Sequence, residues 1–432
     1  MSIKFNKRVL IFPGGTEVGL EIARSLRYCK EVEVYSAASG VKQHAPFVYE
    51  DHHEVPSISD PACLQALNNL ISEWGIDCIF PANPLVIDFL NRHRDQISAV
   101  LITSDSEVLS ITRSKTATYE RMKNYLAVPR IYTEINADDK FPIFIKPDAM
   151  YGSQGARSVN SYSEYLACPP DPSEVVCEYL PGIEYTVDCF SNRHNELLFV
   201  GPRTRERIRM GTSMHSETPP EDTQVLLRDM AAIIQTHLKM RGAWFFQAKY
   251  AADGTLKLLE VESRIAGTMA LHRVQGVNFA LLSILDAYEI NVSIKTLKAN
   301  VIIDRALTNR YFHNVCFDTV YVDLDDTIIV KGRLNLQMIR FLYQCINKNQ
   351  KIVLLSKSLE ADPVKHLQRW RILNIFDDIY WLTESDSKAR FITNKHSIFI
   401  DDSFTQRMEV ERELGIPTFD PSMVELLIDE RW

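Results

Sequence analysis

Two aspartates near the C-terminus combine residue type and spacing in a way that suits phosphoryl transfer. Asp323 and Asp325 lie two positions apart, and Asp323 directly follows the apolar run 319–322, which has the pattern of a buried strand. One carboxylate of such a pair can attack phosphorus as a nucleophile, while the other donates a proton to the leaving group and later activates water. The pair by itself also fits a solvated turn, so its meaning depends on other residues.

Further polar positions follow comparable patterns in the same segment. Ser356, and the pair Asp401 and Asp402, each end an apolar strand-like run, and Lys388 opens a helix-like stretch. The carboxyl ends of parallel strands meet at one edge of a sheet, where ligands bind in open α/β folds. We therefore expect these side chains to gather at that edge.

The ordered series of Asp-x-Asp-x-Thr, an apolar run ending in Ser, a Lys, and an apolar run ending in Asp-Asp resembles the haloacid-dehalogenase-like phosphatase superfamily across about residues 315–432. The resemblance implies a phosphatase that uses Mg²⁺ and an aspartyl-phosphate intermediate. Position by position it implies a nucleophile at Asp323, a general acid/base at Asp325, an orienting hydroxyl at Thr327, phosphoryl ligands at Ser356 and Lys388, and magnesium ligands at Asp323, Asp325 and Asp401, with Asp402 beside them. No motif position is missing, which favours an active domain over a regulatory or structural one.

The intervals between these motifs are short. One helix and one strand account for the chain between Asp325 and Lys357, and again between Lys357 and Lys388. We therefore expect no large cap domain. An open site of this kind either accepts a large substrate or is covered by the rest of the chain, and we favour the second alternative.

A lysine and a loop of small residues in the middle of the chain suit polyphosphate binding. Lys146 ends an apolar strand-like run and is followed by a loop that contains Ser153 and two glycines, so that backbone N–H groups can approach phosphate while the lysine supplies charge. Further along, Glu260 and Glu262 lie two apart on a predicted strand. They project from one face, as a pair of carboxylates that holds Mg²⁺ must.

The lysine and loop, then the segment 178–188, then Gln247, then Glu-Val-Glu-Ser-Arg at 260–264 occur in an order that resembles the ATP-grasp superfamily, particularly its carbamoyl-phosphate-synthase-like members, over roughly residues 1–300. The resemblance implies nucleotide contacts at Lys115, Lys146, Ser153, Glu178, Leu180 and Glu184, magnesium ligands at Gln247, Glu260 and Glu262, and a contact of Arg264 with the transferred phosphate. Many members carry Asn in place of Glu262, and often an acidic residue in place of Gln247.

Arginines are dense between residues 203 and 209. A solvated charged strand would explain them, but the planar guanidinium also suits a carboxylate or an acyl phosphate. Arg203, Arg207 and Arg209 are therefore candidates for binding an acid substrate.

The ATP-grasp resemblance implies an ADP-forming, amide-forming ligase. A carboxylate attacks the γ-phosphate of ATP in the presence of Mg²⁺, with Mn²⁺ as an alternative ion, and an amine captures the acyl phosphate. The expected partners are thus a small carboxylate, an amine and a phosphate ester, and a homodimer remains one option. The competing hypothesis keeps the ligase and assigns the C-terminal domain a regulatory or structural role.

Three glycines follow the first predicted strand, at Gly14, Gly15 and Gly19. Their spacing is not that of a dinucleotide-binding fingerprint, and the next strand lacks the acidic residue expected to hold a ribose, so NAD binding is not expected. Two readings stay open. The glycines allow a tight turn with close packing of helix and strand, or they contact phosphate or substrate at the helix N-terminus.

These motifs need three domains to position them. Alternating strand and helix patterns predict an α/β domain at 1–112, hairpins and longer strands predict an α+β domain at 113–305, and a second α/β pattern predicts a third domain at 306–432. The resemblances imply that these are a Rossmann-like domain, an ATP-grasp domain and a Rossmann-like, haloacid-dehalogenase-like domain. The chain is thus expected to be an α/β and α+β multidomain protein.

Composition limits the function class. Hydrophobic residues make up 46% of the chain and the net charge is −8, which fits a globular protein and argues against a nucleic-acid partner, because that partner needs a basic surface. No apolar run is long enough to span a bilayer. The eight cysteines are scattered without metal-binding spacing, as in reduced cytoplasmic proteins. We therefore expect a cytoplasmic enzyme.

Overall fold

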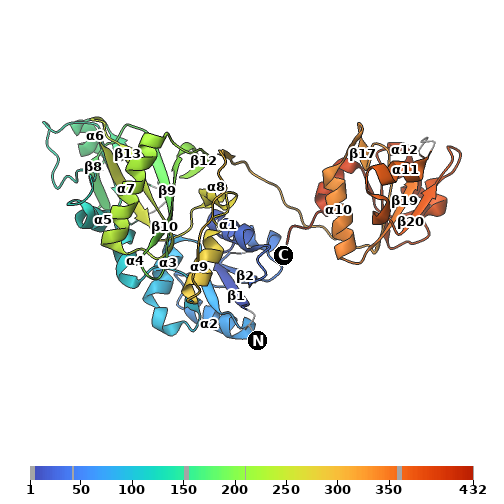
Figure 1. Cartoon of the computed structure of the whole chain (residues 1–432), viewed down its shortest axis with the longest axis horizontal. Coiled ribbons are helices and arrows are strands. Elements are labelled where there is room, and N and C mark those ends of the chain that lie inside the picture. The colour runs from blue at the N-terminus through green and yellow to red at the C-terminus, as the bar shows by residue number, and fades with distance from the viewer. Residues whose placement is uncertain (1–4, 41–42, 150–154, 210, 358–361, 432) are drawn as a thin grey trace. The chain divides into compact units, whose positions relative to one another are not determined.

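The structure is a computed structural model that describes residues 5–40, 43–149, 155–209, 211–357 and 362–431 of the 432-residue chain. It has two compact units, residues 1–307 and residues 308–431, which run from blue to yellow and from orange to red in Figure 1. Among the helices of the described residues, none is long and apolar enough to cross a membrane.

Unit 1 begins with a five-stranded parallel sheet in the order β3-β2-β1-β4-β5. Apolar side chains cover both faces of its central strand, with α1 packed on one face and α2 and α3 on the other, as a parallel sheet requires. The strands are β1 (Lys7–Phe12), β2 (Val32–Ala38), β3 (His52–Glu54), β4 (Cys78–Pro81) and β5 (Val100–Leu101), and the helices are α1 (Glu17–Leu26), α2 (Cys63–Trp74), α3 (Pro84–Arg92), η1 (Ala45–Phe47) and η2 (Arg94–Gln96).

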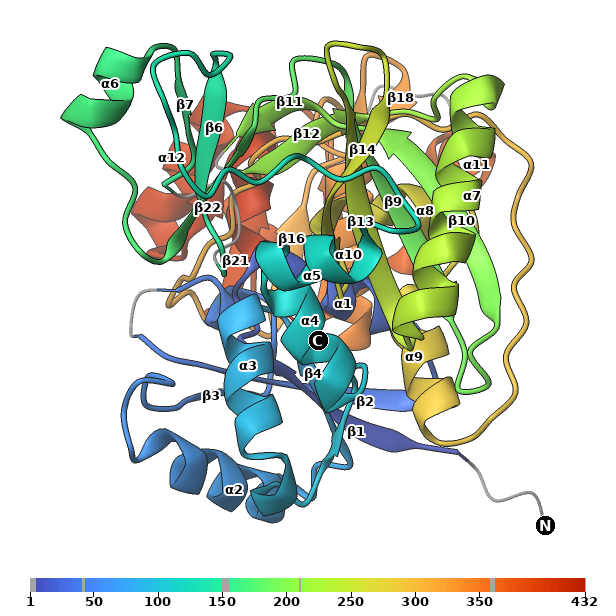
Figure 2. The same ribbon diagram turned by 90° about the vertical axis from the view of Figure 1, so that its left-hand side faces the viewer.

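The rest of unit 1 contains three antiparallel sheets, with the orders β7-β6-β8, β10-β9-β13-β14 and β11-β12-β15. Their strands are β6 (Ile143–Pro147), β7 (Arg157–Val159), β8 (Glu174–Glu178), β9 (Glu184–Ser191), β10 (Leu197–Thr204), β11 (Glu206–Arg209), β12 (Thr212–Ser216), β13 (Gly242–Tyr250), β14 (Leu256–Glu262) and β15 (Ile303–Asp304). Figure 2 shows the sheet of β6 and β7 apart from the larger sheet of β9, β10, β13 and β14.

Helices cover both faces of the four-stranded sheet. One face packs against α4, α5 and α7, and the other packs against α9, which also contacts α1 of the first sheet. The first sheet and the four-stranded sheet therefore share one apolar core. The helices of this part are α4 (Ser106–Arg113), α5 (Lys115–Met122), α6 (Tyr162–Ala167), α7 (Glu221–Leu238), η3 (Gly267–Met269), α8 (Ala270–Arg273) and α9 (Phe279–Ala287).

Unit 2 is a five-stranded parallel sheet in the order β20-β19-β16-β21-β22. Apolar side chains of α10 and α11 pack on one face and those of α12 on the other. The strands are β16 (Thr319–Val322), β19 (Lys351–Ser356), β20 (Asp378–Trp381), β21 (Ser397–Ile400) and β22 (Thr418–Phe419). A separate hairpin of β17 (Ile329–Val330) and β18 (Arg333–Leu334) lies between β16 and α10 in the chain. The predicted C-terminal parallel sheet is thus confirmed.

The helices of unit 2 are α10 (Leu336–Asn347), α11 (Pro363–Arg369), η4 (Leu373–Ile375), η5 (Lys388–Phe391), α12 (Phe404–Leu414) and η6 (Pro421–Leu427). Between Ser356 and Lys388, the described residues form only α11, η4 and β20. These described residues contain no inserted cap domain. Earlier in the chain, the hairpin of β17 and β18 turns at Lys331 and Gly332, whose backbone φ angles are both in the left-handed region.

Candidate active sites

A cavity of about 650 Å³ lies in unit 1, bounded by the sheet of β6 and β8, the four-stranded sheet, the β11–β12 hairpin and the N-terminus of α1. Many of the residues predicted for the ligase site line it, namely Lys115, Lys146, Glu178, Leu180, Glu184, Arg203, Arg209, Gln247, Glu260 and Arg264. Of the other predicted residues, Glu262 and Arg207 do not line this cavity, and Ser153 lies outside the described residues.

Lys115 is the first residue of α5, and Asp148 anchors this helix start to the end of β6. The Asp148 carboxylate accepts hydrogen bonds from Ser114 Oγ at 2.6 Å and from the Thr116 N–H at 2.8 Å. The backbone carbonyl oxygen of Asp148 accepts a third hydrogen bond, from Lys115 Nζ at 3.3 Å. Burial lowers the pKa of Lys115. Our sequence reasoning missed Asp148, although it lies only two residues after Lys146.

Two of the cavity-lining carboxylates form ion pairs. Lys257 Nζ donates to both carboxylate oxygens of Glu178, at 2.6 and 2.8 Å, so this side chain is fixed at the end of β8. Glu184 opens β9 and forms an ion pair with Arg205 at 2.8 Å. Leu180 is buried nearby. Arg205 is a second residue that sequence reasoning missed, although it lies within the arginine-rich stretch.

The predicted metal ligands lie on neighbouring strands. Gln247 of β13 is opposite Glu260 of β14, and its amide donates to Glu260 at 3.0 Å while accepting from Arg205 Nε at 3.3 Å. Glu262 accepts a hydrogen bond from Arg264 Nε at 3.1 Å, and burial raises the pKa of its carboxyl group. Gln247, Glu260 and Arg264 thus line the cavity together, whereas Glu262 contacts Arg264 but does not line it.

The three arginines predicted to bind substrate have different environments. Arg203 is 2% exposed, and its Nε and Nη2 donate to Asp188 at 2.7 and 3.1 Å. Arg207 is exposed and forms an ion pair with Asp304 at 2.9 Å. Arg209 lines the cavity, is exposed, and has no ion-pair partner among the residues that the structure describes. Their role in substrate binding stays a prediction, and Arg209 has the guanidinium most available for it.

The N-terminal glycines have a packing role in the structure. A Cβ atom on Gly19 would lie 2.6 Å from the carbonyl oxygen of Gly14, and one on Gly14 would lie 1.9 Å from Ser36 Oγ. Both positions thus need glycine for the close approach of helix and strand. Thr16 caps α1 and also lines the cavity, so a contact of this helix start with substrate stays open.

Unit 2 has a second cluster at the carboxyl ends of its parallel strands. Lys388 Nζ donates to Asp323 Oδ1 and to Asp401 Oδ2, each at 2.6 Å, and all three residues are buried. Burial raises the pKa of Asp323 to about 7, with Lys388 acting in the opposite direction and Asp401 in the same one. Two carboxylates thus share one ammonium, an arrangement that favours uptake of a proton or of another cation.

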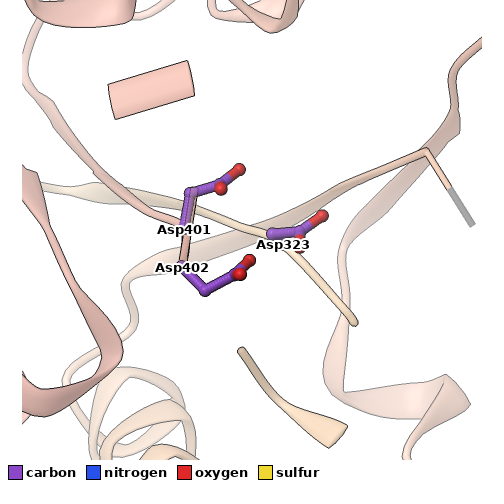
Figure 3. Close-up of side chains that lie close together, drawn as sticks. All are labelled: Asp323, Asp401 and Asp402. Atoms are coloured by element: carbon purple, nitrogen blue, oxygen red, sulfur yellow. The ribbon is translucent and has the colours of Figure 1, made fainter. Parts of the chain in front are cut away.

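The other predicted residues of unit 2 surround this cluster. Asp402 lies beside Asp323 and Asp401 (Figure 3). One carboxylate oxygen of each residue lies within 4.8 Å of the other two. Thr327 is buried, and its Oγ1 accepts a hydrogen bond from the Asp402 N–H at 3.0 Å. Ser356 is buried at the end of β19, whereas Asp325 is exposed. The described cluster that could hold a metal ion thus contains Asp402 and leaves the Asp325 side chain outside it.

Comparisons with known proteins agree with the geometry of unit 1. Residues 171–305 match the protein family described as ATP-grasp in the biosynthetic pathway with Ter operon. A 3-methyl-D-ornithine–L-lysine ligase from Methanosarcina barkeri is 24% identical over 191 residues, which are 44% of this chain and 50% of that protein. The chain thus matches about half the length of this curated relative.

Two groups of solved structures share the fold. Biotin carboxylase from Campylobacter jejuni is 15% identical with a TM-score of 0.55, over 67% of this chain and 73% of that chain. N5-carboxyaminoimidazole synthetase from Staphylococcus aureus, in complex with ADP, is 17% identical with a TM-score of 0.57, over 71% and 83%. The chain therefore has the ATP-grasp fold, preceded by a Rossmann-like domain and followed by a C-terminal parallel α/β sheet.

Proposed function

We propose that unit 1 is an ATP-dependent ligase that joins a carboxylate to an amine. The observation that carries the proposal is the cavity that brings two lysines, two of the oxygen-bearing side chains and Arg264 together. The relative named as a 3-methyl-D-ornithine–L-lysine ligase supports the amide-forming class, and a solved structure of the same fold that contains ADP supports the nucleotide.

Residues that line the cavity, together with Glu262 on the same strand as Glu260, divide the work of the reaction. The ammonium groups of Lys115 and Lys146 neutralise the phosphates of ATP, and the segment 178–180 receives the adenine. Gln247, Glu260 and Glu262 offer the oxygen atoms that Mg²⁺ prefers, and this ion would supply further neutralisation of phosphate charge when bound. Arg264 faces the phosphoryl group in transfer, so the protein contributes chiefly position and charge.

The proposed reaction has two steps. A carboxylate oxygen of the acid attacks the γ-phosphorus, the bond to the β,γ-bridging oxygen breaks, and ADP leaves. The amine nitrogen then attacks the acyl carbon, inorganic phosphate leaves, and the nitrogen loses a proton. We assign the binding of the acid to Arg209, a proposal supported by its place in the cavity lining and by the absence of an ion-pair partner among the described residues.

A screen of carboxylates and amines for ADP release tests this function. We expect ADP release only when a matching acid and amine are both present, and we expect Glu260→Ala to reduce it at least tenfold. Glu73→Ala, a change at an exposed residue of α2 outside the cavity, serves as the control and should leave the rate unchanged. A Glu260→Ala variant with the wild-type rate would refute the assignment of Glu260 as a metal ligand.

A second function is proposed for unit 2, namely the hydrolysis of a phosphate ester by a haloacid-dehalogenase-like mechanism. The observation in its favour is the buried ammonium of Lys388 between Asp323 and Asp401 at the carboxyl ends of β16 and β21. The carboxylates of Asp323, Asp401 and Asp402 lie close enough to share one cation, so they fit Mg²⁺, which would neutralise phosphoryl charge.

In the proposed hydrolysis Asp323 attacks phosphorus and the ester oxygen leaves with a proton from Asp325. Water activated by Asp325 then attacks the aspartyl phosphate and releases inorganic phosphate, which restores the Asp323 carboxylate. Ser356 and Lys388 contact the phosphoryl oxygens, and Thr327 orients the loop through its hydrogen bond with Asp402.

Release of phosphate from a generic phosphate ester in Mg²⁺ buffer tests this second function. We expect Asp323→Asn to abolish release, whereas Asp378→Asn, at a surface ion pair with Lys351, should have no effect. Equal release from wild type and Asp323→Asn would refute the phosphatase. That result would favour the alternative in which unit 2 has a regulatory or structural role beside the ligase.

A further inference from the structure

Tyr119 is a buried residue of α5 that the proposed ligase chemistry does not use. Its side chain is 1% exposed, and its hydroxyl group has two hydrogen-bond partners. The hydroxyl donates to the carbonyl oxygen of Leu259 at 2.7 Å and accepts from Lys146 Nζ at 2.8 Å. One phenol thus links three separate elements of unit 1.

Those three elements carry the groups that would contact the nucleotide phosphates. Lys115 and Tyr119 lie four residues apart on α5, so they are on the same face of the helix. Lys146 lies on β6, and the carbonyl oxygen bonded by Tyr119 belongs to the residue just before Glu260 on β14. The Tyr119 hydroxyl therefore links Lys146 to the strand that carries the proposed metal ligand Glu260, from the helix that begins at Lys115.

The direction of the hydrogen bonds follows from the chemistry of the partners. A carbonyl oxygen can only accept, and an ammonium can only donate, so the phenolic proton points to Leu259 and the oxygen lone pairs point to Lys146. Burial raises the pKa of Tyr119 well above its usual range, so the phenol stays protonated and uncharged. Lys146 is thus anchored by a neutral acceptor.

Because the Tyr119 hydroxyl is uncharged, it holds Lys146 without cancelling the charge of the ammonium. Among the residues that the structure describes, no carboxylate forms an ion pair with Lys146, whereas Lys257 is paired with Glu178 and Lys388 with two aspartates. The Lys146 ammonium thus has no carboxylate in contact among the described residues, and beyond its hydrogen bond to Tyr119 it has two further N–H groups for a ligand. A carboxylate in the place of Tyr119 would hold the lysine equally well but would cancel this charge.

We infer that Tyr119 is a positioning residue that aims the uncompensated charge of Lys146 at the phosphates of the nucleotide, an inference that rests on the ligase function proposed above. Its hydroxyl fixes the lysine without neutralising it. Removal of the hydroxyl leaves the ammonium without its anchor, so the affinity for phosphorylated nucleotides falls while the affinity for the nucleoside does not.

Calorimetric titration of the full-length protein with MgADP and with adenosine tests the inference. Tyr119→Phe keeps the buried ring and removes only the hydroxyl, and we expect the dissociation constant for MgADP to rise about tenfold, as for loss of a hydrogen bond to a charged group. Adenosine binding should stay within about twofold of wild type, since adenosine has no phosphate for Lys146. Tyr288→Phe, which loses a hydrogen bond to the Asp77 carbonyl oxygen away from the cavity, is the matched control and should change neither constant.

A double-mutant cycle with Lys146→Met separates positioning from a general effect on the fold. In the Lys146→Met background the further change Tyr119→Phe should have no effect on MgADP binding, because the group that it positions is gone. Additive effects, or an equal loss of adenosine and MgADP binding, would overturn the inference. So would a Tyr119→Phe variant that binds MgADP like wild type. If the wild-type protein itself does not bind MgADP, the ligase proposal fails, and the inference fails with it.

Discussion

Replacement of Arg203 by methionine leaves the Asp188 carboxylate in the four-stranded sheet without its guanidinium partner. Arg203 and Asp188 are 2% and 0% exposed and are joined by two hydrogen bonds, at 2.7 and 3.1 Å. The nearby His272 offers little compensation, because burial lowers its pKa and keeps it uncharged. Methionine retains much of the volume of the arginine stem, so the change removes charge with little loss of packing.

The expected cost follows from the burial of both groups. Breaking a buried ion pair by removing one partner destabilises a protein by about 3–5 kcal/mol, because the remaining charge has neither solvent nor counter-ion. Arg209→Met is the matched control, since Arg209 is exposed and has no ion-pair partner among the described residues. That change should alter the free energy of unfolding by less than about 0.5 kcal/mol.

Hydrogen exchange followed by mass spectrometry measures the free energy of unfolding locally in this sheet. Peptides from β9 and β13 report on unit 1 alone, and their exchange in wild type and Arg203→Met gives the difference in unfolding free energy. Substrate-stimulated ADP release at several acid concentrations then shows whether Arg209→Met raises KM for the acid without a change in stability. We expect Arg203→Met to change the stability of the sheet and Arg209→Met to change only KM.

A second substitution, at Asp188, tests whether the unpaired carboxylate causes the loss of stability. If the cost arises from the unpaired Asp188, then Asp188→Leu combined with Arg203→Met should recover most of the lost stability, since a hydrophobic pair can replace a buried ion pair with little cost. A loss of less than about 1 kcal/mol in Arg203→Met, or a double variant less stable than the single one, would refute this account.

Three further predictions concern unit 2 and the first glycines. Lys388→Met should lower the unfolding free energy of unit 2 by about 3–5 kcal/mol in Mg²⁺-free buffer, because Asp323 and Asp401 lose the ammonium between them, and urea unfolding with and without Mg²⁺ should show partial recovery with the ion. Because the pKa of Asp323 is raised to about 7, this carboxyl is protonated at lower pH and a proton competes with the cation. Calorimetry should therefore show tighter Mg²⁺ binding at about pH 8 than at about pH 6. Equal affinities at the two pH values would contradict the claim that a proton and Mg²⁺ compete for the Asp323 carboxylate. Gly19→Ala should destabilise unit 1 by about 1–3 kcal/mol, because its Cβ would overlap the carbonyl oxygen of Gly14, and thermal unfolding that matches wild type would contradict the packing role.

Local patterns in the sequence predict much of the fold and the approximate position of both candidate sites. Apolar runs that end in Ser356 or Asp401 are visible without coordinates, because strand periodicity and the carboxyl-end position of ligand residues depend only on neighbouring residues. The structure confirms the parallel C-terminal sheet, and the solved structures confirm the ATP-grasp fold with its Rossmann-like domain. The spacing of Glu260 and Glu262 likewise predicts that they share a face of one strand.

Tertiary structure alone determines which charges are free and which are already paired. Arg203 and Arg209 look alike in the sequence, yet one is paired with Asp188 inside the sheet and the other is exposed at the cavity. Tyr119 carries no motif, and its contacts with Lys146 and Leu259 join residues 27 and 140 positions away. Such partners come from distant parts of the chain, and only the packing of helix against sheet brings them within hydrogen-bond distance.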